Sequence, residues 1–535
     1  MVVCSPSSVS TSSERCGGCP VIAQSYGTQL AGKQLRIAES LARYPDLAAQ
    51  PVERVLGADA IVGYRTRAKL MVAPGGRLGL YAKGGGHQVV DIPGCRVLAP
   101  ALACVAEVIR ARVREHEGTA GALAPYDPPS GGALRGVDLR ETRESEGAAP
   151  RVLLTLIVQR TQVGELSVLQ AEAERIMSLA PDVAGVAVNF HDGDLPQVLG
   201  GETTLLAGAS SLPDRLGASV HLATYGSFVQ AHRGQALKVH QLVSRAFAVG
   251  ARAAEGTPAR ILDLYGGSGA IALGLAAAGA QVHLVESFPP AVASAQAAAS
   301  SQGLALRAEC GDVATVLRTL VDRGARYDGV VVNPPRRGMS PVAREWVARL
   351  GAEAVAYVSC DPDTLARDLD HFRRLGYAPR SVQPLDMIPL TEEVETVVIL
   401  DRAAPALPRV VHETEEILVV EKAAHEPTAP QGEYSTSLLT RARRLAGADA
   451  AVPAHRLDVG TSGLVILVRS PSLLSKWQEV LAAAETRKVY VAAVRGVTPS
   501  KGAITRDLRE DGKMHPARTR YRRLAVASGH SILRV

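Results

Sequence analysis

The chain has 535 residues, of which 47% are hydrophobic and 21% are charged, and its formal net charge is +6. The length predicts about three or four domains, and the composition is typical of a soluble globular protein. No apolar run is long enough to cross a bilayer, and the Ser/Thr-rich start of the chain lacks the pattern of a signal peptide. We therefore expect a cytoplasmic protein with no membrane partner.

Positive charge is concentrated in the last part of the chain. Residues 409–535 hold 20 Lys+Arg and 13 Asp+Glu, a net charge of +7, which leaves −1 for the first 408 residues. This distribution fits a phosphate-rich partner of the C-terminal region. On charge alone, a well-solvated basic surface explains it equally well.

Four cysteines in the first hundred residues form a candidate metal site. Cys16 and Cys19 form a Cys-x-x-Cys pair, Cys4 lies upstream, and Cys95 ends the segment Asp91–Cys95. Four thiols suit either zinc or an iron–sulfur cluster, and the spacing alone makes zinc the default. The long gap before Cys16 leaves open that Cys4 is not a ligand.

Hydrophobic patterns divide the rest of the chain. A helix is predicted from about Gln29 to Tyr44. Strands are predicted at Tyr64–Val72, Leu78–Tyr81, Val152–Gln159 and Ala184–Phe190. Residues 226–402 alternate strand and helix, which indicates a parallel, doubly wound sheet. Ala403–Pro408 contains two prolines and is predicted to be a linker, and a strand-rich domain follows at 409–535.

A glycine-rich loop connects a strand to a helix in the third region. The predicted strand Arg260–Tyr265 runs into Gly266–Gly269, which includes Gly267, and an Ala/Leu-rich helix follows. The next strand ends in Glu286, about 20 residues on, where a carboxylate can accept hydrogen bonds from ribose hydroxyls. The loop lacks the full glycine spacing of dinucleotide-binding loops, so the alternative to a nucleotide site is a tight turn with a structural role only.

Two further polar residues follow predicted strands. Asp312 lies where a nucleotide-binding sheet often presents an acceptor to adenine, and Asn333 begins Asn-Pro-Pro-Arg after the run Val330–Val332. The order of glycine-rich loop, Glu, Asp and Asn-Pro-Pro is typical of S-adenosylmethionine methyltransferases more than of NAD enzymes. Methyltransferases of nucleic-acid amino groups place an aromatic residue after Asn-Pro-Pro, whereas Arg336 follows here.

Cys360 lies between an apolar run and a predicted helix start. Ala354–Val358 precedes it, and Asp361 and Pro362 suit the N-cap and the first helical position. A thiol at a helix N-terminus feels the positive end of the macrodipole, which predicts a lowered pKa and a thiolate nucleophile. A buried structural cysteine is the alternative.

With Cys360 added, residues 1–402 resemble the uracil-5 RNA methyltransferases, and most closely the 23S rRNA members that lack an N-terminal OB-like domain. Asn333–Gly338 matches their Asn-Pro-Pro-Arg-Arg-Gly. The resemblance implies S-adenosyl-L-methionine as methyl donor, Cys360 as nucleophile and Glu395 as base. The implied donor site comprises Gln230, Tyr265, Glu286 and Asn333, to which the loop and acceptor patterns add Gly267 and Asp312.

These residue types suit the chemistry of uracil. Carbon 5 is a poor nucleophile, and thiolate addition at carbon 6 makes it enolate-like. A base must then remove the carbon-5 proton so that the thiol can leave. Glu395 lies at the start of the apolar strand Val394–Leu400, where partial burial is expected to raise its pKa. A surface carboxylate at a strand edge is the alternative. The target base must leave its stack to reach Cys360.

The resemblance also bears on the N-terminal half. Relatives carry a [4Fe–4S] cluster, which Cys4, Cys16, Cys19 and Cys95 would hold here. Residues 1–100 are then an iron–sulfur region, and residues 51–225 a mixed α/β RNA-binding region. The chain departs from the family at two places. Relatives have His-Thr-x-His where Leu390–Glu393 stands, and Asn where His232 stands.

Residues 409–535 resemble large-subunit-type pseudouridine synthases. The matching motifs are His455–Asp458, Thr461–Leu464, Lys488–Tyr490 and Ile417–Lys422. The resemblance implies Asp458 as catalytic carboxylate. Family members continue with further strands, so we expect this α+β domain to be C-terminally incomplete, with Ile532–Val535 in mid-strand and an unpaired edge.

The sequence as a whole predicts an α/β chain with a Rossmann-like S-adenosylmethionine methyltransferase domain at 226–402. We expect it to methylate carbon 5 of a uridine in RNA, with 23S rRNA as the expected substrate and tRNA as the alternative, and to act as a monomer. Pseudouridylation through Asp458 as the main activity is a second hypothesis. A non-catalytic RNA-binding or assembly factor is a third.

Overall fold

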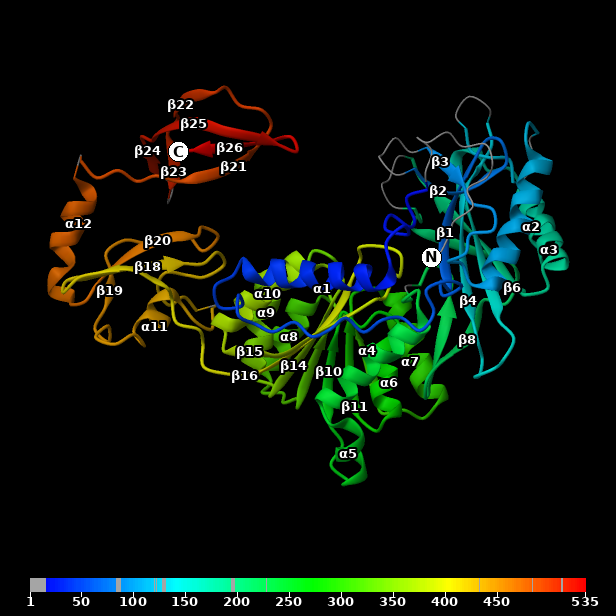
Figure 1. Cartoon of the computed structure of the whole chain (residues 1–535), viewed down its shortest axis with the longest axis horizontal. Coiled ribbons are helices and arrows are strands. Elements are labelled where there is room, and N and C mark those ends of the chain that lie inside the picture. The colour runs from blue at the N-terminus through cyan, green and yellow to red at the C-terminus, as the bar shows by residue number, and fades with distance from the viewer. Residues whose placement is uncertain are drawn as a thin grey trace. The chain divides into compact units, whose positions relative to one another are not determined.

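The polypeptide divides into two units at Leu407, within the segment 403–408 that was predicted as a linker. One unit holds Met1–Leu407 and Gly432–Thr436, and the other holds Pro408–Gln431 and Ser437–Val535. The computed structural model describes residues 16–82, 88–119, 121, 123–127, 131–193, 198–227, 229–432, 434–483, 485–510 and 513–535. Figure 1 shows the elements of both units in chain order.

A seven-stranded sheet organises the C-terminal half of the first unit. Its strands are β10 (Arg260–Leu264), β11 (Gln281–Glu286), β12 (Leu306–Cys310), β13 (Gly329–Val332), β14 (Ala354–Ser359), β15 (Tyr377–Leu385) and β16 (Glu395–Arg402). The order is β12-β11-β10-β13-β14-β16-β15. The first five strands in this order are parallel, whereas β16 runs antiparallel to both of its neighbours.

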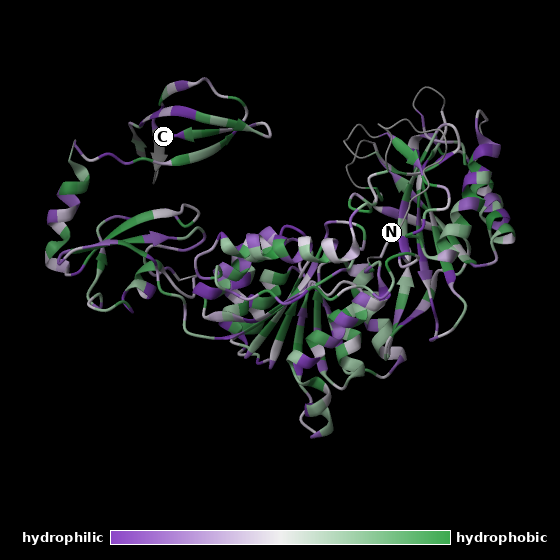
Figure 2. Cartoon of the chain, in the orientation of Figure 1, coloured by the Kyte–Doolittle hydropathy of each residue, from purple (hydrophilic) through white to green (hydrophobic). Residues whose placement is uncertain are grey.

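Helices cover both faces of this sheet, as the strand–helix alternation predicted. They are α1 (Tyr26–Ala42), α4 (Arg233–Ala246), α5 (Val249–Ala254), α6 (Ala270–Ala277), α7 (Pro289–Ser301), α8 (Val313–Asp322), α9 (Pro341–Leu350) and α10 (Pro362–Arg374). One core cluster joins Leu262 and Val330 to α1, α8, α9 and α10, and another joins Ile261 and Val331 to α4, α6 and α7. The strands are apolar on both sides for this reason, and Figure 2 shows them as hydrophobic ribbons.

Helix α1 begins three residues before its predicted start. The Ser25 hydroxyl caps it by accepting a hydrogen bond from the Thr28 amide at 3.2 Å. Ile37 and Leu41 pack into the core cluster of α8, α9 and α10. Lys33, fully buried, pairs with the buried carboxylate of Asp386. This N-terminal helix is therefore part of the same packed body as the large sheet.

The segment between α1 and α4 forms a second sheet. Its strands are β1 (Arg67–Ala73), β2 (Arg77–Tyr81), β3 (Val89–Asp91), β4 (Leu134–Thr142), β5 (Arg151–Gln159), β6 (Val183–His191) and β7 (Glu202–Gly208). They are ordered β3-β2-β1-β4-β5-β6-β7, and only β5 and β6 pair in parallel. Helices α2 (Pro100–His116) and α3 (Leu166–Leu179) share its core through Leu102, Ile109 and Ile176. A short helix, η1 (Arg160–Gln162), and the hairpin of β8 (Ser211–Leu216) and β9 (Ser219–Thr224) complete the segment.

The second unit contains two four-stranded sheets. The first has the order β17-β18-β20-β19, with β17 (Val410–Glu413), β18 (Ile417–Lys422), β19 (Val452–Pro453), β20 (Gly463–Val468) and the helix α11 (Leu438–Ala442). Next in sequence come η2 (Pro471–Leu473) and α12 (Leu474–Ala482). The second sheet has the order β21-β26-β25-β22, with β21 (Val491–Arg495), β22 (Lys501–Thr505), β25 (Arg518–Ala527) and β26 (His530–Arg534), besides the hairpin β23 (Leu508–Glu510)–β24 (Lys513–His515).

The last strand, β26, is an inner strand of this sheet. It pairs with β21 on one side and with β25 on the other, and β21 and β22 are the edge strands. Among the described residues, no helix combines the length and the hydropathy that crossing a bilayer requires.

Candidate active site

Three of the predicted donor-site residues follow neighbouring strands at the carboxyl edge of the large sheet. Tyr265 follows β10, Glu286 ends β11, and Asn333 follows β13. The register pairs Leu264 with both Val285 and Val332, so the three residues emerge side by side. The carboxyl edge of such a sheet is where doubly wound proteins bind ligands.

The antiparallel strand β16 brings Glu395 to the same edge. Ser359, the last residue of β14, is in register with Thr396, so Cys360 and Glu395 are the next residues on each strand. The negative charge of Glu395 acts on the Cys360 thiol, which is consistent with this register. Cys360 and Glu395 thus lie at the same edge of the sheet because β16 runs antiparallel to β14.

The carboxyl group of Glu395 is buried, and burial raises its pKa to about 7. Arg336 opposes this shift, and Glu393 adds to it. The expectation that burial at the start of β16 would raise the pKa of Glu395 is confirmed. A carboxylate with a pKa near neutrality can accept a proton at physiological pH.

The Cys360 thiol departs from the sequence-based expectation. Burial, followed by the charge of Glu395, raises its pKa above the ordinary value, and only Arg336 and a backbone hydrogen bond act in the opposite direction. Asp361 does cap α10, because its carboxylate accepts a hydrogen bond from the Thr364 amide at 2.9 Å. The prediction of a lowered pKa was wrong because burial and a neighbouring carboxylate outweigh the helix terminus.

Glu286 has its carboxylate fixed by the backbone around it. One oxygen accepts from the Gly267 amide at 3.1 Å, and the other accepts from the amides of Ser287 and Phe288 at 2.7 and 2.9 Å. Tyr265 has φ of +60°, a left-handed conformation that is costly for a bulky residue. Burial raises the pKa of Tyr265 to about 12, so its hydroxyl is a donor at neutral pH. Strain at a sheet edge of this kind is common at ligand sites.

Asp312 follows β12 at this edge, and Gln230 lies in the segment before α4. The Asp312 carboxylate caps α8 by accepting from the Thr315 amide at 3.0 Å, and its charge reaches the Tyr265 hydroxyl. The residue after Gln230, Ala231, accepts a hydrogen bond at its carbonyl from the amide of Thr66, which lies one residue before β1, at 3.0 Å.

His232 stands where the uracil-5 methyltransferases that the chain resembles have an asparagine, and its contacts show how the fold accommodates the change. Its Nδ1 accepts a hydrogen bond from the Gln235 amide at 3.4 Å and so caps α4. Its Nε2 lies 3.0 Å from the Ala60 carbonyl, and its ring stacks on Tyr64 at 5.0 Å. The imidazole thus accepts a hydrogen bond from a backbone amide of the first turn of α4, as an asparagine side chain does at an N-cap.

The loop before Glu395 shows how the second departure is accommodated. Leu390 stands where relatives have a histidine, and its φ is +67°. The Gln29 side-chain oxygen accepts from the Leu390 amide at 3.1 Å, and the Val21 amide donates to the Leu390 carbonyl at 3.4 Å. Thr391 donates to the Ile388 carbonyl at 2.7 Å. The N-terminal segment therefore holds the loop that leads to the candidate base.

Asp368 organises the loop that follows Asn333. Its carboxylate is fully buried on α10 and pairs with the buried guanidinium of Arg344 on α9. It also accepts hydrogen bonds from the Tyr357 hydroxyl at 2.7 Å and from the Met339 amide at 2.8 Å. One carboxylate therefore joins β14, α9, α10 and the end of the loop.

Helix α10 contacts the same loop at two further points. The Thr364 hydroxyl donates to the Arg336 carbonyl at 2.9 Å, and Arg367 donates to the Arg337 carbonyl at 2.8 Å. Gly338 has φ of +73°, and a Cβ there would lie 2.6 Å from Asp368 Oδ2. The Arg336 side chain meanwhile pairs with Glu393 at 2.9 Å. The helix that starts beside Cys360 thus fixes the loop that carries Arg336.

Three of the four candidate metal ligands are described. Cys19 and Cys95 pack against the same small cluster as Tyr64, and Cys16 forms a β-bridge with Ala82. Cys4 lies outside the described residues. In the part of the chain that the structure covers, no group of three or more His, Cys, Asp or Glu side chains is arranged to hold a metal ion.

The loop of Asp458 in the second unit is held by buried polar contacts. Lys422, fully buried, donates to the carbonyls of Glu426 at 2.6 Å and Val459 at 3.3 Å. The Thr428 hydroxyl donates to the Leu457 carbonyl at 3.0 Å. Asp458 itself is exposed.

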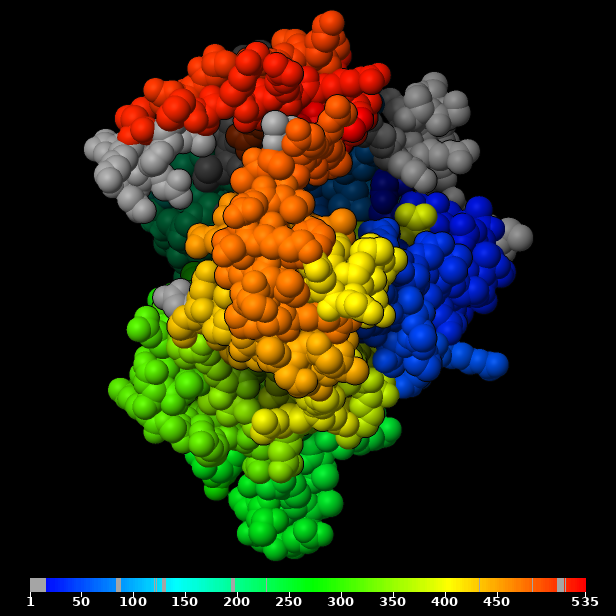
Figure 3. Space-filling model, turned by 90° about the vertical axis from the view of Figure 1, so that its left-hand side faces the viewer, coloured from blue at the N-terminus to red at the C-terminus, as the bar shows by residue number. Residues whose placement is uncertain are grey.

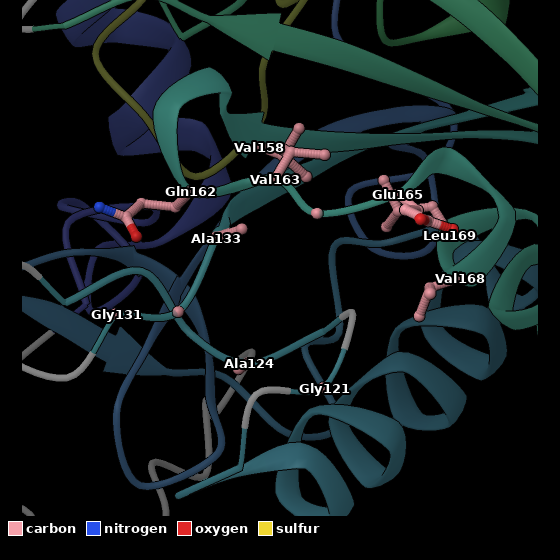
Figure 4. A pocket seen from close by; sticks show the side chains of 12 residues that line it. Gly121, Ala124, Gly131, Ala133, Val158, Gln162, Val163, Glu165, Val168 and Leu169 are labelled. Atoms are coloured by element: carbon pink, nitrogen blue, oxygen red, sulfur yellow. The ribbon is translucent and has the colours of Figure 1, made fainter.

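A cavity of about 270 Å³ lies away from these residues, in the second sheet of the first unit. Figure 4 shows it between the start of β4, the end of β5 and the start of α3, lined by Val158, Val168 and Leu169 among others. Among the lining residues that the structure describes, Glu165 is the one with an acidic or basic side chain.

Sequence reasoning missed Asp368, Gln29 and Asp263. Asp368 shares the helical spacing of Leu365, Leu369 and Phe372, so an acidic residue on an apolar face was the available signal. Asp263 lies buried in β10, and burial raises its pKa to about 7, although a backbone hydrogen bond from Ala272 acts in the opposite direction. Nothing local in the sequence indicates the contact of Gln29 with Leu390.

Comparisons with known proteins match both units of the chain. Residues 248–361 match a family model described as methyltransferase small domain, and residues 416–535 match one described as RNA pseudouridylate synthase. The crystal structure of Pyrococcus abyssi tRNA (uracil-54, C5)-methyltransferase in complex with S-adenosyl-L-homocysteine shares the fold. It aligns with a TM-score of 0.56 and 23% identity over 72% of this chain and 86% of that one.

Sequence relatives narrow the class further. The chain is 31% identical over 394 residues to an uncharacterized RNA methyltransferase of Geobacter sulfurreducens, which covers 73% of this chain and 76% of the relative. It is 32% identical over 400 residues to one of Gloeobacter violaceus, which covers 73% and 81% respectively. The chain belongs to the RNA methyltransferase family and carries a pseudouridine synthase domain at its C-terminus.

Proposed function

We propose that the chain transfers a methyl group from S-adenosyl-L-methionine to carbon 5 of a uridine in RNA. The observation that carries this proposal is the pairing of a half-buried thiol, Cys360, with a buried carboxyl, Glu395, at the carboxyl edge of the large sheet. Methylation at nitrogen or oxygen needs no cysteine nucleophile. Methylation at carbon 5 needs both a nucleophile for carbon 6 and a base for the carbon-5 proton.

The thiol acts first. Its pKa is raised in the free protein, so a minority is thiolate at neutral pH, and Arg336 is the cation that favours the charged form. Cys360 Sγ adds to carbon 6 of the flipped uracil, and the electron pair of the 5,6 double bond moves toward carbon 5 and the carbonyl at carbon 4. Bound S-adenosyl-L-methionine would supply a methyl group on a positively charged sulfur. Carbon 5 attacks this methyl carbon, and the electrons of the broken sulfur–carbon bond stay on the sulfur, which leaves as the thioether S-adenosyl-L-homocysteine.

Glu395 completes the reaction. Its carboxylate takes the proton from carbon 5, and the electrons of that bond re-form the double bond as the Cys360 thiolate leaves carbon 6. The pKa of about 7 lets Glu395 be ionised in a large fraction of molecules at neutral pH while still holding a proton well.

Residues at the neighbouring strand ends suit the methyl donor. Glu286 is a fixed acceptor for ribose hydroxyls, and Asp312 is an acceptor for the adenine side. Tyr265, Gly267, Asn333 and Gln230 complete the proposed donor site. The RNA substrate we propose is 23S rRNA, with tRNA as the alternative, as in the protein of Pyrococcus abyssi whose fold is shared.

Nucleoside analysis tests the proposal. Unmodified 23S rRNA and, separately, tRNA are incubated with the protein and labelled S-adenosyl-L-methionine, then digested and analysed by mass spectrometry. We expect 5-methyluridine in one RNA and none with Cys360→Ala. With Glu395→Gln, elimination fails, so a covalent protein–RNA adduct should accumulate and migrate slowly in a denaturing gel. A methylated base other than 5-methyluridine contradicts the proposal.

For the N-terminal cysteines we propose a [4Fe–4S] cluster on Cys4, Cys16, Cys19 and Cys95. Cys19 and Cys95 pack against one small core cluster, and thiolates are the ligands that an iron–sulfur cluster takes. Protein purified without oxygen should be brown and lose visible absorbance in Cys95→Ser. Cys104→Ser, an exposed cysteine, is the matched control. A colourless protein that contains zinc contradicts the cluster.

A second activity is favoured by one specific observation. Residues 416–535 match the RNA pseudouridylate synthase family, and Lys422 and Thr428 hold the loop of Asp458. We propose Asp458 as its catalytic carboxylate. Pseudouridine that forms with the wild type and not with Asp458→Ala supports this role, and equal amounts from both exclude it.

A further inference from the structure

Cations repeat along strand β25 of the second unit. From Arg518 the strand has the sequence Arg-Thr-Arg-Tyr-Arg-Arg. Successive side chains of a strand point to opposite faces, so Arg518, Arg520 and Arg522 share one face. These three are exposed, whereas Tyr521 and Arg523 on the opposite face are partly buried. Figure 3 shows the C-terminal strands, in red, as a band of exposed surface.

Neighbouring strands add two cations to the same face. The register places Lys501 of β22 opposite Arg522, and Arg534 of β26 opposite Arg522 on its other side. Directly opposite residues of an antiparallel pair lie on one face. Lys501 and Arg534 are exposed as well. We call Lys501, Arg518, Arg520, Arg522 and Arg534 the cationic face.

This arrangement places like charges together without neutralisation. Within the residues that the structure describes, none of the five forms an ion pair, although Arg469 and Arg441 in the same unit pair with Glu413 and Glu426. Like charges directly opposite on neighbouring strands destabilise a sheet. The row Lys501–Arg522–Arg534 therefore costs the free protein stability, and a polyanion lying on the face would remove that cost.

We propose that the cationic face binds the phosphate backbone of an RNA strand. Its arginines recur about every 7 Å along β25, which presents a line of positive charge to a linear polyanion. The four strands place no Phe, Tyr or Trp on this face, so it offers no platform for base stacking and contacts phosphates instead. RNA is the polyanion that fits, because the chain belongs to an RNA methyltransferase family and this unit to RNA pseudouridylate synthases.

A salt titration of RNA affinity tests this role on the full chain. The probe is single-stranded oligoadenosine, which contains no uracil and so is not a substrate of either proposed active site. Arg518→Gln/Arg520→Gln/Arg522→Gln removes three cations of the face. We expect the slope of log affinity against log salt to fall by about 2, since each phosphate contact on a single strand contributes about 0.7. If the two proteins bind equally at about 1 M salt, the variant binds about 100-fold more weakly at about 0.1 M.

A matched variant controls for total charge. Arg318→Gln/Arg323→Gln/Arg326→Gln removes three exposed arginines from the first unit. We expect it to leave the slope and the affinity for oligoadenosine unchanged. An equal loss in both variants means that the protein binds RNA through its net charge, which overturns the proposal.

Thermal unfolding provides a second test, because the proposal predicts the direction in which the melting temperature changes. Removing Arg518, Arg520 and Arg522 should raise the melting temperature of the second unit by roughly 1–3 °C, because repulsion is relieved. A lower melting temperature, or an unchanged salt slope, overturns the proposal. Methylation of a uracil-containing RNA at saturation should be unaffected in this variant. That assay with the wild type tests the proposed methylation separately.

Discussion

Asp368 offers the sharpest test of how the loop beside Cys360 is held. Its side chain and that of Arg344 are 0% and 1% exposed, and the carboxylate also accepts from Tyr357 and Met339. In Asp368→Asn the side chain keeps its size and loses its charge. In Asp368→Ala the guanidinium, the hydroxyl and the amide all lose their acceptor.

The expected loss of stability follows from burial. Removing one partner of a buried ion pair costs about 3–5 kcal/mol, because the other charge remains buried without compensation. Each buried donor left without an acceptor costs about 1–3 kcal/mol more. We expect Asp368→Asn to lower the free energy of unfolding of the first unit by about 3 kcal/mol and Asp368→Ala by about 5 kcal/mol or more.

Asp363 on the same helix is the matched control. It pairs with Arg43, but the two side chains are 54% and 64% exposed. Exposed pairs contribute at most about 1 kcal/mol, so Asp363→Asn should cost less than that. The chain has two tryptophans, and a Trp477→Phe background leaves Trp346 on α9 to report urea unfolding of the first unit. Equal costs for Asp368→Asn and Asp363→Asn would refute the reasoning.

Three further outcomes are expected. Turnover of methylation should rise with pH through about 7, because Glu395 must be ionised to take the carbon-5 proton; a rate that is flat from acid to neutral pH contradicts this. Glu395→Gln should lower the pKa of Cys360, since the carboxylate charge raises it, so alkylation of the thiol at mildly alkaline pH should be faster than in the wild type. Ser528→Asn should stabilise the β25–β26 hairpin by about 0.5–1 kcal/mol, measured by thermal unfolding, because Ser528 (φ +47°) and Gly529 form a turn that favours Asn-Gly. No gain in stability would mean that strain at Ser528 is not limiting.

The local pattern of the sequence was sufficient for the elements of the large sheet. Apolar runs followed by glycines or polar residues placed β10, β13 and β14 to within about two residues. Buried strands of a parallel sheet need apolar residues on both sides, so their signal is continuous and local. Glu286, Asn333 and Cys360 each come at the end of a predicted strand, and the parallel strands of the structure bring these ends to one edge.

The pKa of Cys360 depends on contacts between residues that are distant in the sequence, so only the tertiary structure determines it. The lowered pKa expected for Cys360 from its helix terminus was wrong, because Glu395, brought beside it by an antiparallel edge strand, and burial act in the opposite direction. A sequence shows that a helix begins after Cys360. It does not show which charges fold against the thiol.

The candidate base and the loop beside the nucleophile also depend on long-range contacts. Gln29 holds Leu390 from more than three hundred residues away, and Asp368 joins two helices, a strand and a loop. The sequence by itself determined which residue types are present and at which strand ends they lie. Only the tertiary structure decided how they are buried and paired, because desolvation and Coulomb energies depend on distances that local patterns do not contain.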